Sequence, residues 1–165
     1  MDKSILWKLS YGLYAVCLMD GQRPSGCIVN TFFQVTSGGV VAVSMNRDNY
    51  THSLIEKHNR FGVCILSEST PARTIGALGF FSGRDKEKFA GLDYRMHEGI
   101  PLLNEGCCGY LILDVVGRYE TDTHTVFFAQ VEDAFAGVDI RSMTYEYYRS
   151  VIKGKSPKNA PTYGV

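Results

Sequence analysis

The fold is decided by residues 26–46, which have the sequence GCIVNTFFQVTSGGVVAVSMN. β-Branched and aromatic residues dominate on both sides of Gly38-Gly39, a pattern typical of two strands joined by a tight turn. We therefore predict strands over residues 26–36 and 40–46. Polar side chains stand near the ends of both strands, so this region is also expected to present hydrogen-bonding groups to a ligand.

The rest of the chain continues in the same way, with short turns between apolar runs. Further strands are predicted over residues 14–19, 60–66, 109–119 and 125–133. Short helices are predicted over residues 4–10, from about 49, over 71–78 and over 143–152. Most strands follow one another without an intervening helix, which favours a mainly β protein, an antiparallel barrel with a few short helices, over a doubly wound parallel sheet.

Composition limits the classes of function. The 165 residues form one predicted domain, residues 1–165, with a Pro- and Lys-rich C-terminal arm from about residue 154. Lys+Arg and Asp+Glu both number 17, so the zero net charge argues against nucleic-acid binding. No apolar run reaches the roughly 18 residues of a membrane helix, and the N-terminus lacks a signal-peptide core. We expect a cytoplasmic protein without membrane contact.

The five cysteines are Cys17, Cys27, Cys64, Cys107 and Cys108. Their number is odd and no pair has C-x-x-C spacing, so a metal site is not expected. Reduced, buried thiols are the main interpretation, and a strained disulfide between the adjacent Cys107 and Cys108 is the alternative. Cys27, three residues before Asn30, either faces a ligand or is simply buried.

Residues 80–89, FFSGRDKEKF, carry the first indication of chemistry. Gly83 permits a sharp bend in the backbone. Arg84 and Lys88 are suited to bind a phosphate, Arg84 through two parallel hydrogen bonds and Lys88 through a single compact charge. Phe81 and Phe89 can border a flat apolar ring. The segment indicates a phosphorylated planar cofactor, although Ser-Gly-Arg-Asp is also ordinary chemistry for a solvated turn.

A second group of polar residues lies at the strand ends and at the following helix start. A helix N-terminus attracts phosphate, and Thr51 adds a hydroxyl there, although a plain N-cap explains it equally. The residues at the strand ends are Asn30, Thr31, Gln34, Ser44, Asn46 and Asn49. Asn30 and Gln34 could also be polar groups on an exposed strand face. With the Arg84 loop they predict two walls of one cofactor cleft.

These motifs together resemble the flavin reductase-like family of FMN-binding split barrels. The similarity lies in residues 30–36 (NTFFQVT), 41–52 (VAVSMNRDNYTH), 81–89 (FSGRDKEKF) and 122–131 (DTHTVFFAQV). Residues 154–163 (GKSPKNAPTY) resemble the end of the flavin domain in high-molecular-weight rubredoxins. One departure is Gly38-Gly39, where many family members have a proline before the strand.

The resemblance implies a Greek-key split barrel that forms a homodimer and holds one FMN non-covalently per subunit. The cofactor-binding residues that it implies are Asn30, Thr31, Gln34, Ser44, Asn46, Asn49, Thr51, Ser82, Gly83, Arg84, Lys88 and Phe89. His124 is the candidate for contact with the nicotinamide of NADH or NADPH, with a purely structural role as the alternative.

The implied activity is an NAD(P)H-dependent flavin reductase that passes electrons through FMN to an acceptor. An electron-transfer flavoprotein serving a redox protein such as a rubredoxin is the second interpretation, and a flavin-storage or sensing barrel is the third. Exchange and turnover of free FMN would distinguish the first from the second. A storage protein would not be bleached by NADH.

Overall fold

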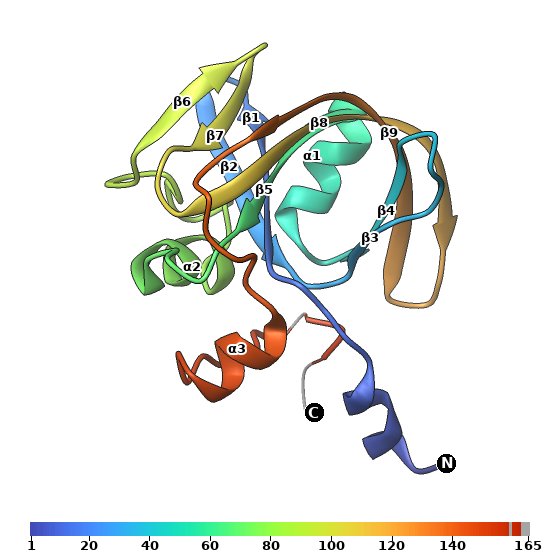
Figure 1. The fold of residues 1–165 in the computed structure, drawn as a ribbon. Helices are drawn as coiled ribbons and strands as arrows, with labels where there is room; N and C mark the ends of the chain where they lie inside the picture. Colours follow the sequence, from blue (N-terminus) through green and yellow to red (C-terminus); the bar gives the residue numbers. More distant parts are fainter. Residues whose placement is uncertain (159, 163–165) are drawn as a thin grey trace.

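The computed structural model describes residues 1–158 and 160–162, and its main feature is one curled antiparallel sheet (Figure 1). The seven strands of the sheet are β1 (Tyr14–Asp20), β2 (Arg23–Val29), β3 (Phe32–Gln34), β4 (Val40–Asn46), β5 (Arg60–Leu66), β8 (Cys107–Glu120) and β9 (His124–Ala136). A separate hairpin is formed by β6 (Tyr94–His97) and β7 (Ile100–Leu103). The helices are the 3-10 helix η1 (Lys3–Lys8), α1 (Tyr50–His58), α2 (Ala72–Gly79) and α3 (Tyr145–Ser150).

The strand order in the sheet is β2-β1-β5-β8-β9-β4-β3. The two edge strands, β2 and β3, are consecutive in sequence and are separated only by Asn30 and Thr31. The sheet must therefore curl until its two edges come close together. The Ser44 amide of β4 donates to the Thr31 carbonyl at 3.0 Å and continues the β3–β4 pairing into this two-residue link. The predicted mainly β, antiparallel split barrel is confirmed.

The strand predicted over residues 26–36 is divided in two, which corrects the sequence-based boundary. β2 pairs with β1, whereas β3 pairs with β4 at the opposite edge of the sheet. The chain changes edges at Asn30, whose side chain donates to Thr162 Oγ1 at 2.8 Å and accepts from Thr31 Oγ1 at 3.1 Å. These side-chain bonds replace strand pairing at the point where the ladder stops.

Two other strands have the boundaries that were predicted from the sequence. The strands predicted over 40–46 and 60–66 are β4 and β5. The two long strands extend beyond their predicted ranges to 107–120 and 124–136, and the β6–β7 hairpin was not predicted. Both hairpin strands have four residues, and Pro101 interrupts the strand pattern of β7.

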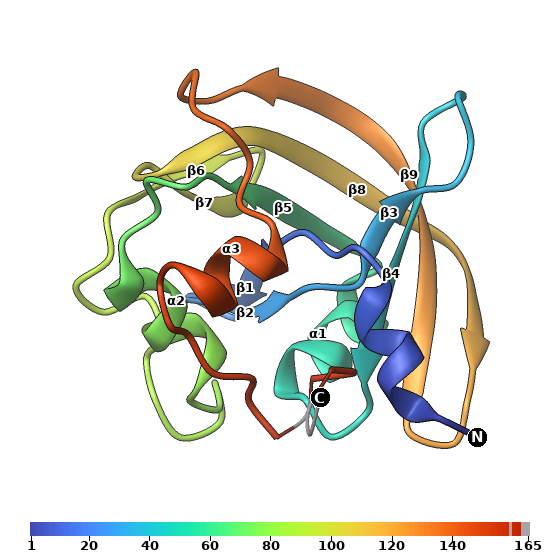
Figure 2. The same ribbon diagram turned by 60° about the horizontal axis from the view of Figure 1, so that its bottom comes forward.

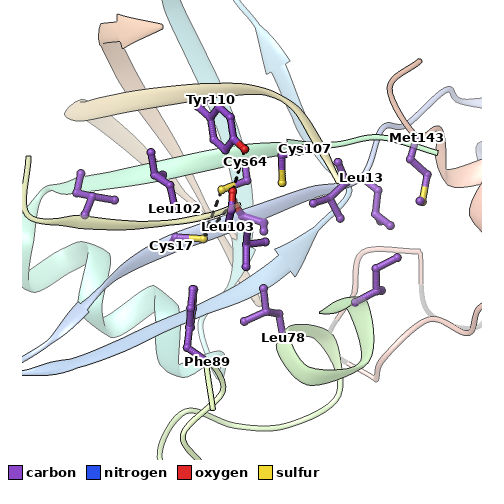
Figure 3. Packing of buried hydrophobic residues seen from close by; sticks show 14 of the residues in the cluster. Leu13, Cys17, Cys64, Leu78, Phe89, Leu102, Leu103, Cys107, Tyr110 and Met143 are labelled. Carbon is purple, nitrogen blue, oxygen red and sulfur yellow. Dashed lines mark hydrogen bonds between the residues drawn. The ribbon is translucent and has the colours of Figure 1, made fainter. Parts of the chain in front are cut away.

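The hydrophobic core has two parts. One contains α1, where Leu54 and Ile55 pack among Phe61, Phe127 and Val63 inside the curve of the sheet. The other lies between the β1–β5–β8 part of the sheet and the segments β7, α2 and α3 (Figure 3). Figure 3 shows Leu78 and Phe89 packed below this part of the sheet.

The second core also contains three buried thiols. Cys17 Sγ lies 3.9 Å from Cys64 Sγ, and Cys107 is in the same cluster. All five cysteines are free, and only Cys108 is partly exposed, so the predicted reduced thiols are found and the vicinal disulfide is not. The described residues contain no cluster of His, Cys, Asp and Glu able to hold a metal.

Helices α2 and α3 and the C-terminal arm gather on one side of the sheet, whereas α1 lies inside its curve. Figure 2 shows α2 and α3 beside β1 and β2, with the arm after α3 running past the start of α1 toward η1. Among the described residues, no helix has the length and apolar character needed to cross a membrane.

Candidate functional site

A cavity of about 410 Å³ lies where the sheet edge, the helices and the arm meet. This size is within the range of roughly 300–1,000 Å³ that is usual for small-molecule and cofactor sites. Its apolar wall includes Ile28, Ile75, Leu78 and Phe81. The polar and charged residues around it are Asn30, Ser44, Asn46, Asp48, Asn49, Tyr50, Ser82, Lys88, Tyr145, Tyr148, Lys155 and Lys158.

The start of α1 forms one corner of the cavity. Asn49 has extended backbone angles and caps the helix, because its side chain accepts from the Thr51 amide at 3.0 Å. Thr51 is buried directly behind this cap. The positive end of the α1 dipole is therefore located at the cavity wall, which favours an anionic group there.

The loop after α2 forms the facing corner. Ser82 organises its turn: the Ser82 carbonyl accepts from the Asp85 and Lys86 amides, both at 3.2 Å, and its hydroxyl accepts from the Arg84 amide. Gly83 is required by close packing, because a Cβ at this position would lie 2.7 Å from Ser25 Oγ and 2.9 Å from Tyr50 Cδ1. The loop thus lies directly against the first residue of α1.

Lys88 is the most informative residue of the cavity. It lines the cavity with only 6% of its surface exposed, and it makes no hydrogen bond or ion pair with any described residue. Burial lowers the pKa of Lys88, while the nearby Cys27 and Cys17 thiols act in the opposite direction. A buried ammonium without a counter-ion is unfavourable in an empty site and is suited to bind an anion.

The arm covers another side of the cavity. Tyr145 and Tyr148 of α3 line the cavity and also hold the arm, since Tyr145 hydrogen-bonds Ser156 and Tyr148 donates to the Lys155 carbonyl at 3.1 Å. Further along, the Thr162 hydroxyl accepts from Asn30. Tyr163, in the same segment of the sequence, lies outside the described residues.

The structure brings six of the predicted cofactor-binding residues to one cavity. They are Asn30, Ser44, Asn46, Asn49, Ser82 and Lys88. Three more predicted residues contact the cavity wall but do not line it. Thr31 donates a hydrogen bond to Asn30, and the Thr51 amide donates to the capping side chain of Asn49. Gly83 packs against Tyr50. The two predicted walls therefore do face one space.

The remaining three predicted binding residues are not at the cavity. Arg84 is exposed, and its guanidinium carbon lies 5.3 Å from the centre of the Tyr50 ring. Phe89 is in the core against Tyr94, and exposed Gln34 donates to the Thr36 carbonyl at 2.9 Å. The i,i+4 spacing of Arg84 and Lys88 does not reveal that only the second enters the cavity.

His124 begins β9 and pairs with Asn46 of β4, so it is one strand away from the cavity without lining it. Its Nδ1 hydrogen-bonds Thr123 Oγ1 at 2.8 Å, while Nε2 is buried and has no hydrogen-bond partner within residues 1–158 and 160–162. Burial, with a smaller contribution from Arg47, lowers the pKa of His124 below 6.5. The imidazole is therefore neutral at pH 7.

Of the aromatic residues of the cavity, the sequence pointed to Phe81 but not to the tyrosines. Tyr50, Tyr145 and Tyr148 line the cavity, and none was assigned to the site. The two α3 tyrosines are three residues apart, which places them on one face of the predicted closing helix. That spacing was the available signal, whereas contact of Tyr50 with the Gly83 loop depends on the tertiary fold.

The chain matches the model of the flavin reductase like domain over residues 7–156 and belongs to this family. The resemblance seen in the motifs is therefore confirmed, and with it the expectation of a flavin-dependent oxidoreductase.

Two relatives are similar over nearly the whole chain. A high molecular weight rubredoxin of Moorella thermoacetica is 39% identical over 100% of this chain and 73% of that protein. A ferric-chelate reductase (NAD(P)H) of Archaeoglobus fulgidus is 37% identical over 99% of this chain and 98% of that protein.

Solved structures agree on the fold. An NADH:FAD oxidoreductase of Streptomyces globisporus, SgcE6, has a TM-score of 0.76 at 22% identity, with 85% of this chain and 84% of that chain covered. The same protein has been solved in complex with NAD and FAD fragments.

Proposed function

We propose that this protein is an NAD(P)H-dependent flavin oxidoreductase that holds one FMN non-covalently in the cavity and passes electrons to an acceptor. The observation that carries the proposal is Lys88, a buried cation at the cavity wall that has no counter-ion among the described residues. One buried lysine and one helix N-terminus suit a single phosphate group, which FMN has and riboflavin lacks.

The proposed contacts follow the cavity wall. Lys88, Ser82 and Asn49 hold the phosphate, and Ser44 and Asn46 bind the ribityl hydroxyls. Asn30 and the apolar wall around Ile28 accept the flavin ring. Thr31, Thr51 and Gly83 support these residues from behind, through the hydrogen bonds and packing described above.

Bound FMN supplies the redox chemistry, accepting a hydride from the nicotinamide and releasing electrons to the acceptor. The protein contributes binding, orientation and exclusion of water. We propose that neutral His124, whose Nε2 bonds none of the described residues, orients the nicotinamide beside Asn46.

The visible spectrum of the purified protein tests the proposal directly. We expect a yellow protein that releases FMN on denaturation, identified by chromatography, and that is bleached anaerobically by NADH or NADPH. Failure to contain flavin and to bind added FMN would contradict the proposal. Bound flavin that neither nucleotide reduces would instead favour storage or sensing.

A second candidate, electron transfer to a redox protein, is favoured by the similarity to a high molecular weight rubredoxin. The two candidates differ in the fate of the cofactor. A flavin reductase turns over added free FMN, whereas an electron-transfer protein keeps its FMN and reduces a protein such as rubredoxin. Anaerobic assays with each acceptor, on protein freed of excess flavin, separate them.

We also propose a homodimer. Among the described residues η1 buries no side chain, and it leaves Ile5, Leu6 and Trp7 more than half exposed; Phe33 of the edge strand β3 is similarly exposed. Contact with a second copy would cover such surface, and a two-fold dimer is the commonest assembly. Light scattering should report two chains of 18.4 kDa, and a monomer with FMN bound would contradict this.

We place the protein in the cytoplasm, a proposal supported by its five free cysteines. Free thiols persist in reducing compartments, whereas exported proteins tend to form disulfides. Fractionation of the native host tests this location.

A further inference from the structure

Cys27 differs from the other four cysteines in its location. Cys17, Cys64 and Cys107 are enclosed in the core shown in Figure 3, and Cys108 is half-buried. Cys27 alone of the five contributes to the cavity wall, where its residue is 3% exposed. A small molecule inside the cavity therefore lies next to Cys27, while the bulk solvent scarcely reaches this residue.

The groups around Cys27 are those that favour a negative charge. Lys88 is more than nine-tenths buried, lines the same cavity and has no hydrogen bond or ion pair with a described residue. The start of α1, with Asn49 and Thr51, lies against β2. Burial raises the pKa of the Cys27 thiol, and Lys88, Thr51 and Asn49 act against that rise.

A bound flavin phosphate and the Cys27 thiolate would both be stabilised by Lys88 and by the start of α1. In the proposed function Lys88 and the α1 start hold the FMN phosphate. A bound phosphate would cover the approach to Cys27 and would neutralise the cation that favours its thiolate. In the absence of flavin, both the approach and the cation are available to the sulfur.

We propose that Cys27 is a thiol modification site controlled by cofactor occupancy: small electrophiles and peroxides react with it when the cavity lacks flavin, and the modified sulfur then prevents flavin from binding. This inference rests on the proposed function. With hydrogen peroxide, a sulfur–oxygen bond forms, the oxygen–oxygen bond breaks, and the products are a sulfenic acid and water. The sulfur is oxidised by two electrons and the peroxide is reduced.

Modification excludes the cofactor for two reasons. An atom added to Sγ needs space, and the cavity offers it, whereas the core around Val29 and Leu54 in which Cys27 also packs is closely filled. An oxidised, negatively charged sulfur would also pair with Lys88 and remove it from the phosphate. A thiol can restore a sulfenic acid, so the block is reversible at that level of oxidation.

The experiment compares flavin-free and FMN-loaded protein. FMN binding is first measured by fluorescence quenching. Each form is then treated with iodoacetamide, or with hydrogen peroxide followed by dimedone, and every cysteine is quantified by peptide mass spectrometry. At free FMN of 100 times its Kd, about 1% of the sites are open, so Cys27 should react about 100-fold more slowly than in the flavin-free protein. Cys108 should react equally in both.

Two further results are expected. Alkylated flavin-free protein should no longer quench FMN fluorescence, whereas Cys27→Ala should bind FMN before and after treatment; Cys27→Ser serves if the alanine variant folds poorly. Cys108→Ala should leave the Cys27 rates unchanged.

Equal Cys27 rates in both forms, or normal FMN binding by the alkylated protein, would overturn the inference while leaving the proposed function intact. Absence of FMN binding by untreated protein would instead overturn the proposed function, and the inference with it.

Discussion

The Tyr50 hydroxyl donates a 2.8 Å hydrogen bond to Asp20 Oδ2, which ties the first residue of α1 to the last residue of β1. Arg23 donates to the same oxygen at 2.9 Å and to the Gly83 carbonyl at 3.0 Å. These bonds, from Arg23 first and Tyr50 second, lower the pKa of Asp20. One carboxylate thereby fixes the helix start and the Gly83 loop relative to each other.

We therefore predict that Arg23→Met weakens FMN binding although Arg23 does not line the cavity. Loss of the bond to Gly83 loosens the loop that presents Ser82 and Lys88, and one hydrogen bond corresponds to a rise in Kd of about 2- to 10-fold. Fluorescence titration measures it, with the exposed Tyr119→Phe as a control. An equal loss for riboflavin would show that the effect does not act through the phosphate end.

Replacement of Lys88 should change stability and binding in opposite directions. Lys88→Met removes a buried charge that pairs with none of the residues the structure describes, so the flavin-free protein should gain about 1–3 kcal/mol in its free energy of unfolding at pH 7. The same change removes a charge-assisted bond to phosphate and should raise the Kd for FMN about 10- to 100-fold. Urea denaturation and FMN titration measure the two effects, with the exposed Lys57→Met as the matched control.

The Lys88 prediction has a pH signature. Because burial lowers the folded-state pKa of Lys88 below 10.5, the unfolded chain binds more protons between these two pKa values. The wild-type stability should therefore rise with pH through that window relative to Lys88→Met. Parallel stability curves for the two proteins would contradict an uncompensated charge at this position.

Arg84→Ala should affect FMN binding less than Lys88→Met. Its guanidinium rests over the Tyr50 ring outside the cavity, a contact of about 0.5–1 kcal/mol at an exposed site. Equal losses for the two variants, measured by the same titration, would mean that Arg84 turns inward when FMN binds.

His124→Ala should slow flavin reduction by NAD(P)H about 10-fold or more through loss of orientation, with FMN content unchanged. Anaerobic stopped-flow measurements give the rate, and His58→Ala, at an exposed position at the end of α1, is the control. A wild-type reduction rate would assign His124 to structure alone.

The arm should stabilise bound flavin. Truncation after Gly154 removes the bond from Asn30 to Thr162 and the segment that lines the cavity, so we expect lower FMN affinity and a lower melting temperature. Thr162→Val keeps the arm but removes the hydroxyl, and should reproduce part of the loss. An unchanged FMN affinity and melting temperature of the truncated protein would show that the arm stabilises neither the fold nor bound flavin.

The sequence predicted those parts of the fold that depend on local pattern. β4 and β5 were located by their β-branched and aromatic residues, and the α1 cap by Asn49 and Thr51. The break at Asn30 was not, because residues 26–36 have a continuous strand pattern and the break arises from closure of the sheet. Likewise, local spacing identified Arg84 and Lys88 as a pair, while only packing determines which one is buried.

The link at Asn30-Thr31 also determines how the barrel can deform. Among the described residues β2 pairs only with β1, and β3 only with β4, so the seam between these two edges is spanned by the Asn30-Thr31 link and not by a strand ladder. Widening the cavity at this seam would rupture far fewer backbone hydrogen bonds than separating any other pair of neighbouring strands. The barrel should therefore deform most easily at this seam. The C-terminal arm is fastened at the seam by the hydrogen bond from Asn30 to Thr162.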